Sequence, residues 1–277
     1  MSGTLFVVAT PIGNLEDLSP RARQTLAEVD LVAAEDTRHT GRLLSHLGLK
    51  TRQIALHDHN EARVTAAVIE HLKEGRSVAL VSDAGTPLVS DPGFRLVRTA
   101  HENGITVAPV PGPSAVTAAL SVSGLPTDRF AFEGFPPSKK AARRKWLQAR
   151  AADERTLVFF EAVHRIAATL ADMAEVFGPD REAFLGRELT KLHEQCVVAS
   201  LGELLDQVDS GTIASKGEFV VAVSGAARAA ESSLEVDRLL AELLELVPAR
   251  QAAAIAARIT GGRRNALYER ILGKAGD

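Results

Sequence analysis

Short apolar segments alternate with longer amphipathic segments along the first 110 residues of the chain. The short segments are bounded by turn residues and are typical of strands buried on both faces of a parallel sheet, whereas the amphipathic segments are typical of helices. Strands are expected at residues 5–9, 31–34, 53–56, 78–81 and 105–110. The alternation predicts a parallel α/β sheet.

The pattern changes near residue 130. Further strands are expected at residues 130–134, 156–160, 182–186, 195–200 and 218–223. Some of these strands follow one another without a helix, which indicates a mixed sheet. Beyond Ala226-Ala227 the chain is rich in Ala, Leu and Arg and is predicted to be helical. The expected domains are therefore 1–115, 116–228 and a small helical appendage, 229–277.

The segment 78–93 joins an apolar strand to a loop of small and polar residues, Ser82, Asp83, Ala84, Gly85 and Thr86. Small residues let a ligand approach the backbone, and open α/β sheets bind ligands at the carboxyl ends of their strands. A ligand site is therefore favoured over a turn that only ends the strand. In the following turn, Asp91 is expected to cap the next helix, with Pro92 at its first position. Ser19 and Pro20 are expected to start the first helix in the same way.

Other strand ends on the same side carry similar loops, at residues 10–14, 35–40, 57–61 and 111–115. The opposite ends of the strands carry little beyond Gly48, Gly75 and Gly104. This one-sided distribution is what a ligand-binding edge of a parallel sheet produces.

Composition and charge exclude several classes. The 277 residues carry a net charge of −3, so a nucleic-acid partner would need a local basic patch. No apolar run approaches the roughly 18 residues of a membrane helix, so no membrane insertion is expected. Cys196 is the only cysteine, which rules out an internal disulfide and fits a reducing cytoplasm; its apolar neighbours predict that it is buried.

Seven segments, taken in order, resemble one known family. They are T-P-I-G-N-L at 10–15, A-E-D-T-R-H-T at 34–40, A-L-H-D-H-N-E at 55–61, L-V-S-D-A-G-T-P at 80–87, P-G-P-S-A at 111–115, R-E-L-T-K at 187–191 and R-R-N-A-L-Y at 263–268. Together they are similar to the ribosomal RNA small-subunit methyltransferase I family, a branch of the tetrapyrrole methylase superfamily.

The resemblance implies two α/β domains with S-adenosylmethionine in the cleft between them, usually in a homodimer. It implies 2′-O-methylation of the ribose of cytidine 1402 in 16S rRNA, within the small ribosomal subunit. The implied cofactor residues are Pro11, Ser82, Asp83, Ala84, Gly85, Thr86, Ser114, Ala115, Phe160 and Gly217. A methylase of a small tetrapyrrole and a non-catalytic RNA-binding ribosome-assembly protein remain the alternatives.

Transfer of a methyl group to a hydroxyl is helped by a general base. Histidine is the side chain that can accept a proton near neutral pH, so His57 and His59 are candidate bases, and Asp36 or Glu35 could accept the proton or orient a histidine. Arg38 and Asn60 are candidate substrate contacts. The competing interpretation is helix capping by Asn60 and a solvated strand end at Glu35-Asp36. No metal site is expected, because no third or fourth ligand is evident.

A run of bases, Lys139, Lys140, Arg143, Arg144 and Lys145, surrounds the only tryptophan, Trp146. Such a run is favoured as a phosphate contact, with the indole stacking on a base, over a solvated helix face. Arg187 and Lys191 either touch substrate or form a surface ion pair. The basic segment 258–270 contacts RNA, forms a helical cap that closes the fold, or makes a dimer contact.

Overall fold

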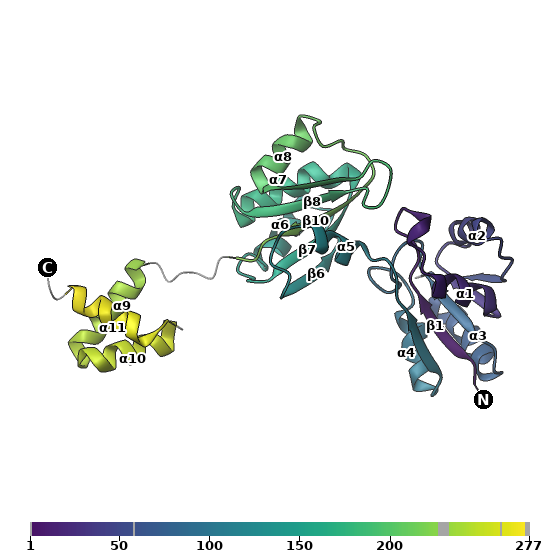
Figure 1. Cartoon of the computed structure of the whole chain (residues 1–277), viewed down its shortest axis with the longest axis horizontal. Helices are drawn as coiled ribbons and strands as arrows, with labels where there is room; N and C mark the ends of the chain where they lie inside the picture. Colours follow the sequence, from purple (N-terminus) through teal and green to yellow (C-terminus); the bar gives the residue numbers. More distant parts are fainter. Residues whose placement is uncertain (1, 58, 227–232, 261, 275–277) are drawn as a thin grey trace. The chain divides into compact units, whose positions relative to one another are not determined.

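The computed structural model describes residues 2–57, 59–226, 233–260 and 262–274. By its internal contacts the chain divides into two compact units, Met1–Gly225 and Ala226–Asp277. Both sheets belong to the first unit, and the second unit is helical (Figure 1). The expected boundary after residue 228 falls within residues 227–232, which lie outside the described residues.

The first sheet has five parallel strands in the order β3-β2-β4-β1-β5, as the alternating pattern predicted. Its elements are β1 (Thr4–Val8), η1 (Leu15–Asp17), α1 (Pro20–Glu28), β2 (Leu31–Ala34), α2 (Thr37–His46), β3 (Gln53–Ala55), α3 (Glu61–Lys73), β4 (Val78–Val81), α4 (Phe94–Glu102) and β5 (Thr106–Val110). Strands β2 and β4 are buried along their whole length. Helices cover both faces: α1 and α2 contribute Leu26 and Leu44 to one core, while α3 and α4 contribute Val68 and Leu96 to the other.

The helix caps agree with the sequence at α1 and differ at α4. Ser19 caps α1 and Pro20 is its first residue, as expected. The N-cap of α4 is Gly93 at φ +123°, so the expectation that Asp91 caps this helix is wrong. The Glu61 carboxylate of α3 instead accepts the backbone N–H groups of Gly93 at 3.2 Å and Arg95 at 2.9 Å. A cap supplied by another helix frees the Asp91 side chain from this role.

The second sheet is mixed, with strand order β6-β7-β10-β8-β9, as the consecutive strands predicted. Strands β6 and β7 are parallel and the remaining pairs are antiparallel. Its elements are α5 (Ala115–Val122), β6 (Phe130–Gly134), α6 (Lys140–Gln148), β7 (Thr156–Ala162), η2 (Val163–Arg165), α7 (Ile166–Phe177), β8 (Glu182–Arg187), β9 (Gln195–Ser200), α8 (Leu201–Asp209) and β10 (Glu218–Val223). The expected α/β fold class is thereby confirmed.

Helices cover this sheet unequally (Figure 1). Helices α6, α7 and α8 bury one face in a core that includes Phe159 and Leu170, whereas α5 packs on the other face around Val220. Strand β9 forms an edge of the sheet, and Cys196 on it is exposed, so its expected burial is wrong. An edge strand with a partly uncovered face leaves alternate side chains in contact with solvent.

The loop after β1 connects the two sheets within the first unit. Ile12 packs in the same apolar cluster as Leu189 and Leu120. The backbone N–H of Asn14 donates to Thr190 Oγ1 at 3.2 Å. A Cβ added at Gly13 would lie 2.3 Å from the Lys191 side chain, so this approach requires glycine. The two sheets therefore meet where the strand-end loops of the first sheet lie.

The second unit consists of α9 (Ser233–Leu246), α10 (Ala249–Thr260) and α11 (Arg264–Lys274). Small residues of α10, among them Ala252 and Ala256, let the helices pack closely around Leu240 and Leu267. Arg270 of α11 pairs with Asp237 of α9 at 2.8 Å. A three-helix unit confirms the expected helical appendage. No helix in the described part of the chain is long and apolar enough to cross a membrane.

Candidate functional site

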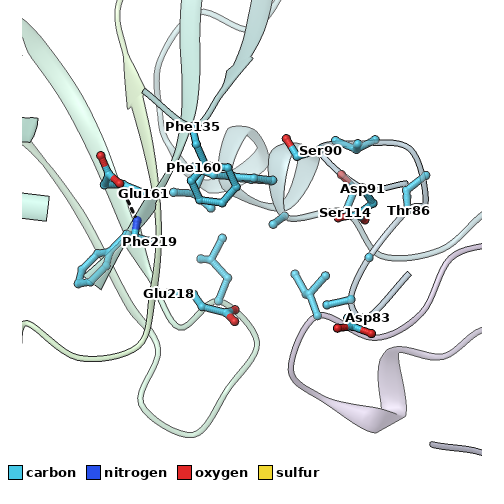
Figure 2. A pocket seen from close by; sticks show the side chains of 18 of the residues that line it. Asp83, Thr86, Ser90, Asp91, Ser114, Phe135, Phe160, Glu161, Glu218 and Phe219 are labelled. Atoms are coloured by element: carbon cyan, nitrogen blue, oxygen red, sulfur yellow. Dashed lines mark hydrogen bonds between the residues drawn. The ribbon is translucent and has the colours of Figure 1, made fainter. Parts of the chain in front are cut away.

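A cavity of about 400 Å³ lies between the carboxyl-terminal loops of the first sheet and the second sheet (Figure 2). This volume is within the range of small-molecule sites, which are mostly apolar with a few placed polar groups. Its lining includes eight of the predicted cofactor residues, Asp83, Ala84, Gly85, Thr86, Ser114, Ala115, Phe160 and Gly217. Pro11 and Ser82 do not line it. The loop neighbours of these two do so instead, since Ile12 and Asp83 reach the cavity.

Backbone pairing holds the loop after β4 against the loop after β1. Thr10 and Gly85 exchange two backbone hydrogen bonds, at 2.9 and 3.0 Å. Gly85 has φ +81°, and a Cβ there would lie 3.2 Å from Ile12 Cγ2, so a side chain would strain this turn. Thr86 Oγ1 donates to Pro113 O at 3.1 Å. The loops after β1, β4 and β5 thus form one braced wall.

Aromatic side chains form part of the opposite wall. The ring of Phe160 packs edge-on against Phe132 and Phe135, with centroid distances of 4.8 and 5.6 Å. Arg165 donates to Pro136 O and so holds the loop that carries Phe135. Phe135 was not identified from the sequence, although it follows the carboxyl end of β6 as the recognised loops follow their own strands.

A close contact with Glu188 positions the start of β10 at the cavity. Gly217 has φ +93°, and a Cβ on it would lie 2.4 Å from Glu188 Cδ. Glu188 Oε1 accepts the backbone N–H of Glu218 at 2.9 Å. Lys191 pairs with the carboxylates of Glu188 at 2.9 Å and Glu218 at 3.0 Å. Lys191 therefore has two acidic partners at the edge of the cavity.

Arg187 is a structural residue. It is 7% exposed, and its guanidinium donates to Lys216 O, His193 O and Gln195 Oε1 at 2.6, 2.8 and 3.1 Å. These bonds hold the backbone just before Gly217 in place. We therefore leave Arg187 out of the set of substrate contacts, because its hydrogen-bonding groups are directed into the protein.

Asp91 lines the cavity and was not identified as a site residue from the sequence. Burial raises the pKa of its carboxyl, a hydrogen bond with Ser82 opposes this rise, and the nearby carboxylate of Asp83 adds to it. No Lys or Arg of the described chain forms an ion pair with Asp91. The signal in the sequence was the second acidic turn after β4, which we assigned to helix capping.

The exits of β2 and β3 lie beside the cavity, because β2 pairs with β4 and β3 pairs with β2. Glu35 lines the cavity and accepts the backbone N–H of Asp83. Asp36 caps α2 and binds Arg38 through both carboxylate oxygens. The hydrogen bonds from Arg38 hold the pKa of Asp36 well below its usual range. Such an acidic group is a poor proton acceptor, so we remove Asp36 from the candidate bases.

The histidine loop follows β3 and does not line the cavity. Asn60 is the N-cap residue of α3, but its side chain braces the preceding turn: Oδ1 accepts the His57 N–H at 2.9 Å, and Nδ2 donates to Ala55 O at 3.0 Å. His57 Nδ1 is buried without a hydrogen-bond partner among the described residues. The rings of His57 and His59 lie 6.0 Å apart. Asp58 of this motif lies outside the described residues.

The basic run of α6 divides into exposed and buried members. Lys139, Lys140 and Lys145 are exposed. Arg143 is 3% exposed and pairs with Asp172 at 2.6 Å, and Arg144 pairs with the same carboxylate at 2.7 Å. Helical periodicity explains the difference, since Arg143 and Leu147 share the buried face. We therefore leave Arg143 out of the proposed RNA contacts.

Trp146 does not offer a stacking surface on both sides. The guanidinium of Arg150 lies 3.6 Å from the centre of its ring, and its ring packs edge-on against Phe159. Arg150 is held in turn by Glu133 at 2.6 Å. Arg150 thus covers one face of the indole, and stacking of the other face on an RNA base stays a prediction. The tryptophan of this basic run is half-buried and packs against the core.

No group of three or more His, Cys, Asp or Glu side chains in the described ranges is arranged to hold a metal ion.

Comparison with known proteins identifies the family. Residues 4–205 match the model of the tetrapyrrole (corrin/porphyrin) methylases, and residues 230–275 match the RsmI C-terminal HTH domain. The chain is 54% identical, over 99% of both chains, to ribosomal RNA small subunit methyltransferase I of Pseudomonas aeruginosa. It is 50% identical to the protein of the same name from Escherichia coli O157:H7, over 99% of this chain and 96% of the other.

Solved structures share the fold at lower identity. Uroporphyrin-III C-methyltransferase from Thermus thermophilus, in complex with S-adenyl homocysteine, superposes with a TM-score of 0.55 at 20% identity, covering 80% of this chain and 97% of the other. Diphthine synthase superposes with a TM-score of 0.59 at 17% identity, covering 80% of this chain and 90% of the other. The chain therefore belongs to the ribosomal RNA small subunit methyltransferase I family of the tetrapyrrole methylases.

Proposed function

We propose that this chain is an S-adenosylmethionine-dependent methyltransferase of small-subunit rRNA, and that its acceptor is the ribose 2′-oxygen of cytidine 1402 in 16S rRNA. The observation that carries the proposal is the identity of 54%, extending over 99% of both chains, to a relative whose name states rRNA methyl transfer. A match of this extent includes the cavity loops and the helical unit alike.

The chemistry of the cavity fits the methyl donor. Phe160 and Phe135 offer aromatic surface to the adenine, and Gly85 and Gly217 leave room for close approach of the ligand to the backbone. Ser114 precedes α5 without making a side-chain cap, so the first N–H groups of that helix can bind the carboxylate of the donor. Asp83 can accept hydrogen bonds from a ribose hydroxyl or an amine.

When bound, S-adenosylmethionine supplies a methyl group on a positively charged sulfur. The residues of this chain then have to place the acceptor oxygen in line and to receive its proton. Glu35 is the candidate base that lines the cavity, and His57 and His59 lie at the exit of β3, on the far side of β2 from β4. We propose that the exits of β2 and β3 bind the acceptor nucleotide beside the cavity.

Exposed bases supply the phosphate contacts in this proposal. Lys139, Lys140 and Lys145 form an exposed basic group on and just before α6, and the side chain of Arg38 is 86% exposed while it binds Asp36. Each phosphate neutralised releases counterions, which makes binding dependent on salt. We further propose that the enzyme works as a cytoplasmic homodimer on the small ribosomal subunit, which sedimentation with and without subunits would test.

The alternatives have weaker support. The proposal of a small tetrapyrrole substrate is supported only by structural neighbours at 20–22% identity. Similarity at that level shows a shared fold and does not identify a substrate. A non-catalytic RNA-binding role leaves the acids and glycines that line the cavity without a purpose, and it predicts that Asp83→Ala changes no phenotype.

The decisive experiment is transfer of labelled methyl groups to small subunits purified from cells that lack this protein. A 2′-O-methyl ribose resists alkaline cleavage, because the 2′-hydroxyl is the attacking group. We expect label in 16S rRNA and a gap in the alkaline ladder after nucleotide 1402. Label without the gap would contradict the proposed acceptor, and absence of label with both subunits and free rRNA would contradict the proposed activity.

A further inference from the structure

The cavity is lined by acids and, among its described lining residues, by no Lys, Arg or His. The acids are Glu35, Asp83, Asp91, Glu161 and Glu218. Two of them are compensated from outside the cavity, because Lys191 pairs with Glu218 and Arg165 pairs with Glu161. The remaining negative potential favours a cationic ligand.

Asp83 and Asp91 differ in their surroundings. The Asp83 carboxylate accepts a backbone N–H, and it lies close enough to Arg38 to raise the pKa of that guanidinium. Asp91 is half-buried and faces the Ser82 hydroxyl and the Asp83 carboxylate, with no cation paired to it in the described chain. Asp91 is therefore the cavity acid whose charge the protein itself compensates least.

A strained loop holds Asp91 in this position. Leu88 and Ser90 have φ values of +72° and +70°, which side-chain-bearing residues rarely adopt, and Gly93 follows at φ +123°. A Cβ on Gly93 would lie 2.8 Å from Leu80 Cδ2, and Glu61 binds the backbone on both sides of Phe94. Strain of this kind persists only where the surroundings over-determine it, and it concentrates at functional sites.

Burial and a neighbouring carboxylate both disfavour the charged form of Asp91. A buried carboxylate of this kind contributes favourably to binding when the ligand carries the opposite charge. Methyl donor and demethylated product share every other group and differ by one methyl group and one positive charge.

We propose, resting on the proposed function, that Asp91 makes this cavity distinguish the sulfonium donor from the neutral thioether product, which weakens product retention after each transfer. The attraction between the Asp91 carboxylate and the sulfonium charge exists only before transfer. The protein's contacts with the adenine, ribose and amino-acid groups are the same for the sulfonium donor and the thioether product, so they do not discriminate between the two.

Calorimetric titration of the full chain tests this inference. The ligands are S-adenosylmethionine, S-adenosylhomocysteine and sinefungin, which carries an ammonium group in place of the methylated sulfur. The proteins are the parent, Asp91→Asn, Asp91→Glu and Glu218→Gln, the last of which removes a cavity charge that Lys191 already compensates. We expect Asp91→Asn to weaken binding of the two cationic ligands about tenfold and of the thioether by less than about threefold.

Asp91→Glu should restore most of the preference, and Glu218→Gln should leave it within about twofold of the parent. Equal losses for all three ligands in Asp91→Asn would overturn the inference, because Asp91 would then act on a group common to them. Unchanged preference in a folded Asp91→Asn would overturn it as well. Failure of the parent to bind any of the three ligands, with or without small subunits, would instead contradict the proposed function, and this inference with it.

Discussion

The carboxylate of Asp83 accepts the backbone N–H of Asp36 at 3.1 Å, while the backbone N–H of Asp83 donates to Glu35 Oε2 at 3.3 Å. The two hydrogen bonds join the loops that follow β4 and β2. The loop after β4 lines the cavity, and the loop after β2 reaches the cavity through Glu35 and carries groups proposed for the acceptor. Asp83 therefore has a mechanical role between the two parts of the site in addition to any contact with a ligand.

Substitution of Asp83 should separate these two roles. Asp83→Asn keeps an oxygen that can accept the Asp36 N–H, so it should preserve the thermal midpoint while weakening binding of S-adenosylmethionine. Asp83→Ala removes the acceptor as well, and we expect an additional loss of about 1–3 kcal/mol in the free energy of unfolding. Thermal melts and calorimetry check this prediction. Equal stability of the two variants would show that the bond to Asp36 contributes nothing.

The exposed lysines of α6 should carry part of the RNA affinity. Changing Lys139, Lys140 and Lys145 together to Ala should weaken binding to small subunits and reduce the slope of log K against log salt by up to about 3. S-adenosylmethionine binding should survive, and Lys50→Ala, which removes an exposed lysine before β3, serves as the control. An unaltered slope in the triple variant would exclude this group from the RNA-binding surface.

Arg143 should prove structural. Arg143→Ala leaves the buried Asp172 without one of its two arginines, and we expect a loss of about 3–5 kcal/mol. Burial opposes ionisation of Asp172, but hydrogen bonds from Arg144 and Arg143 hold the pKa of this carboxyl below its ordinary value. This contribution to stability is present above the ordinary pKa of an aspartate and is lost as the pH falls through the lowered value.

Denaturant titrations at neutral and acidic pH test the Arg143 prediction. The difference between parent and Arg143→Ala should shrink toward the acidic end. Arg143→Met, which fills the same space without charge, should be no less destabilised than Arg143→Ala if the ion pair matters more than packing. A fully stable Arg143→Ala would contradict the assignment.

His57 should affect turnover more than cofactor affinity. His57→Ala removes a candidate base at the exit of β3, so we expect turnover to fall by about 10²–10⁴-fold with little change in S-adenosylmethionine binding. His59→Ala is the matched variant, because His59 is exposed and its ring lies 6.0 Å from that of His57. Single-turnover methylation measures both. Normal turnover of His57→Ala would rule this residue out as the base.

Asp91→Asn should be more stable than the parent at neutral pH. Burial raises the pKa of Asp91 above its value in the unfolded chain. The folded state therefore loses stability as the pH rises from the unfolded-state pKa through the folded-state pKa and the carboxyl ionises. The gain from Asn should therefore be present at neutral pH and vanish at acidic pH, where the parent carboxyl is protonated. We expect no more than about 1 kcal/mol, because Asp91 is only half-buried and solvent screens it. A less stable variant at neutral pH would contradict this account.

Local patterns predicted most of the elements. The strand Val78–Val81 and the Ser19-Pro20 start of α1 followed from apolar runs and capping chemistry, and the structure has both. The Asp83–Thr86 loop was recognisable because small residues after a buried strand have few other uses. Errors arose where one pattern permits two environments. The bases of α6 look alike in sequence, yet Arg143 is buried and Lys145 is exposed.

The sequence by itself determined the order of the elements, the side of the first sheet that carries chemistry and, through its family resemblance, the class of ligand. These properties depend on periodicity and on residues close together in the chain. Only the tertiary structure decided that Glu61 of α3 caps α4, that Asp91 is thereby turned to the cavity, and that Phe135 completes the opposite wall. Those outcomes depend on contacts between distant segments, whose partners no local pattern specifies.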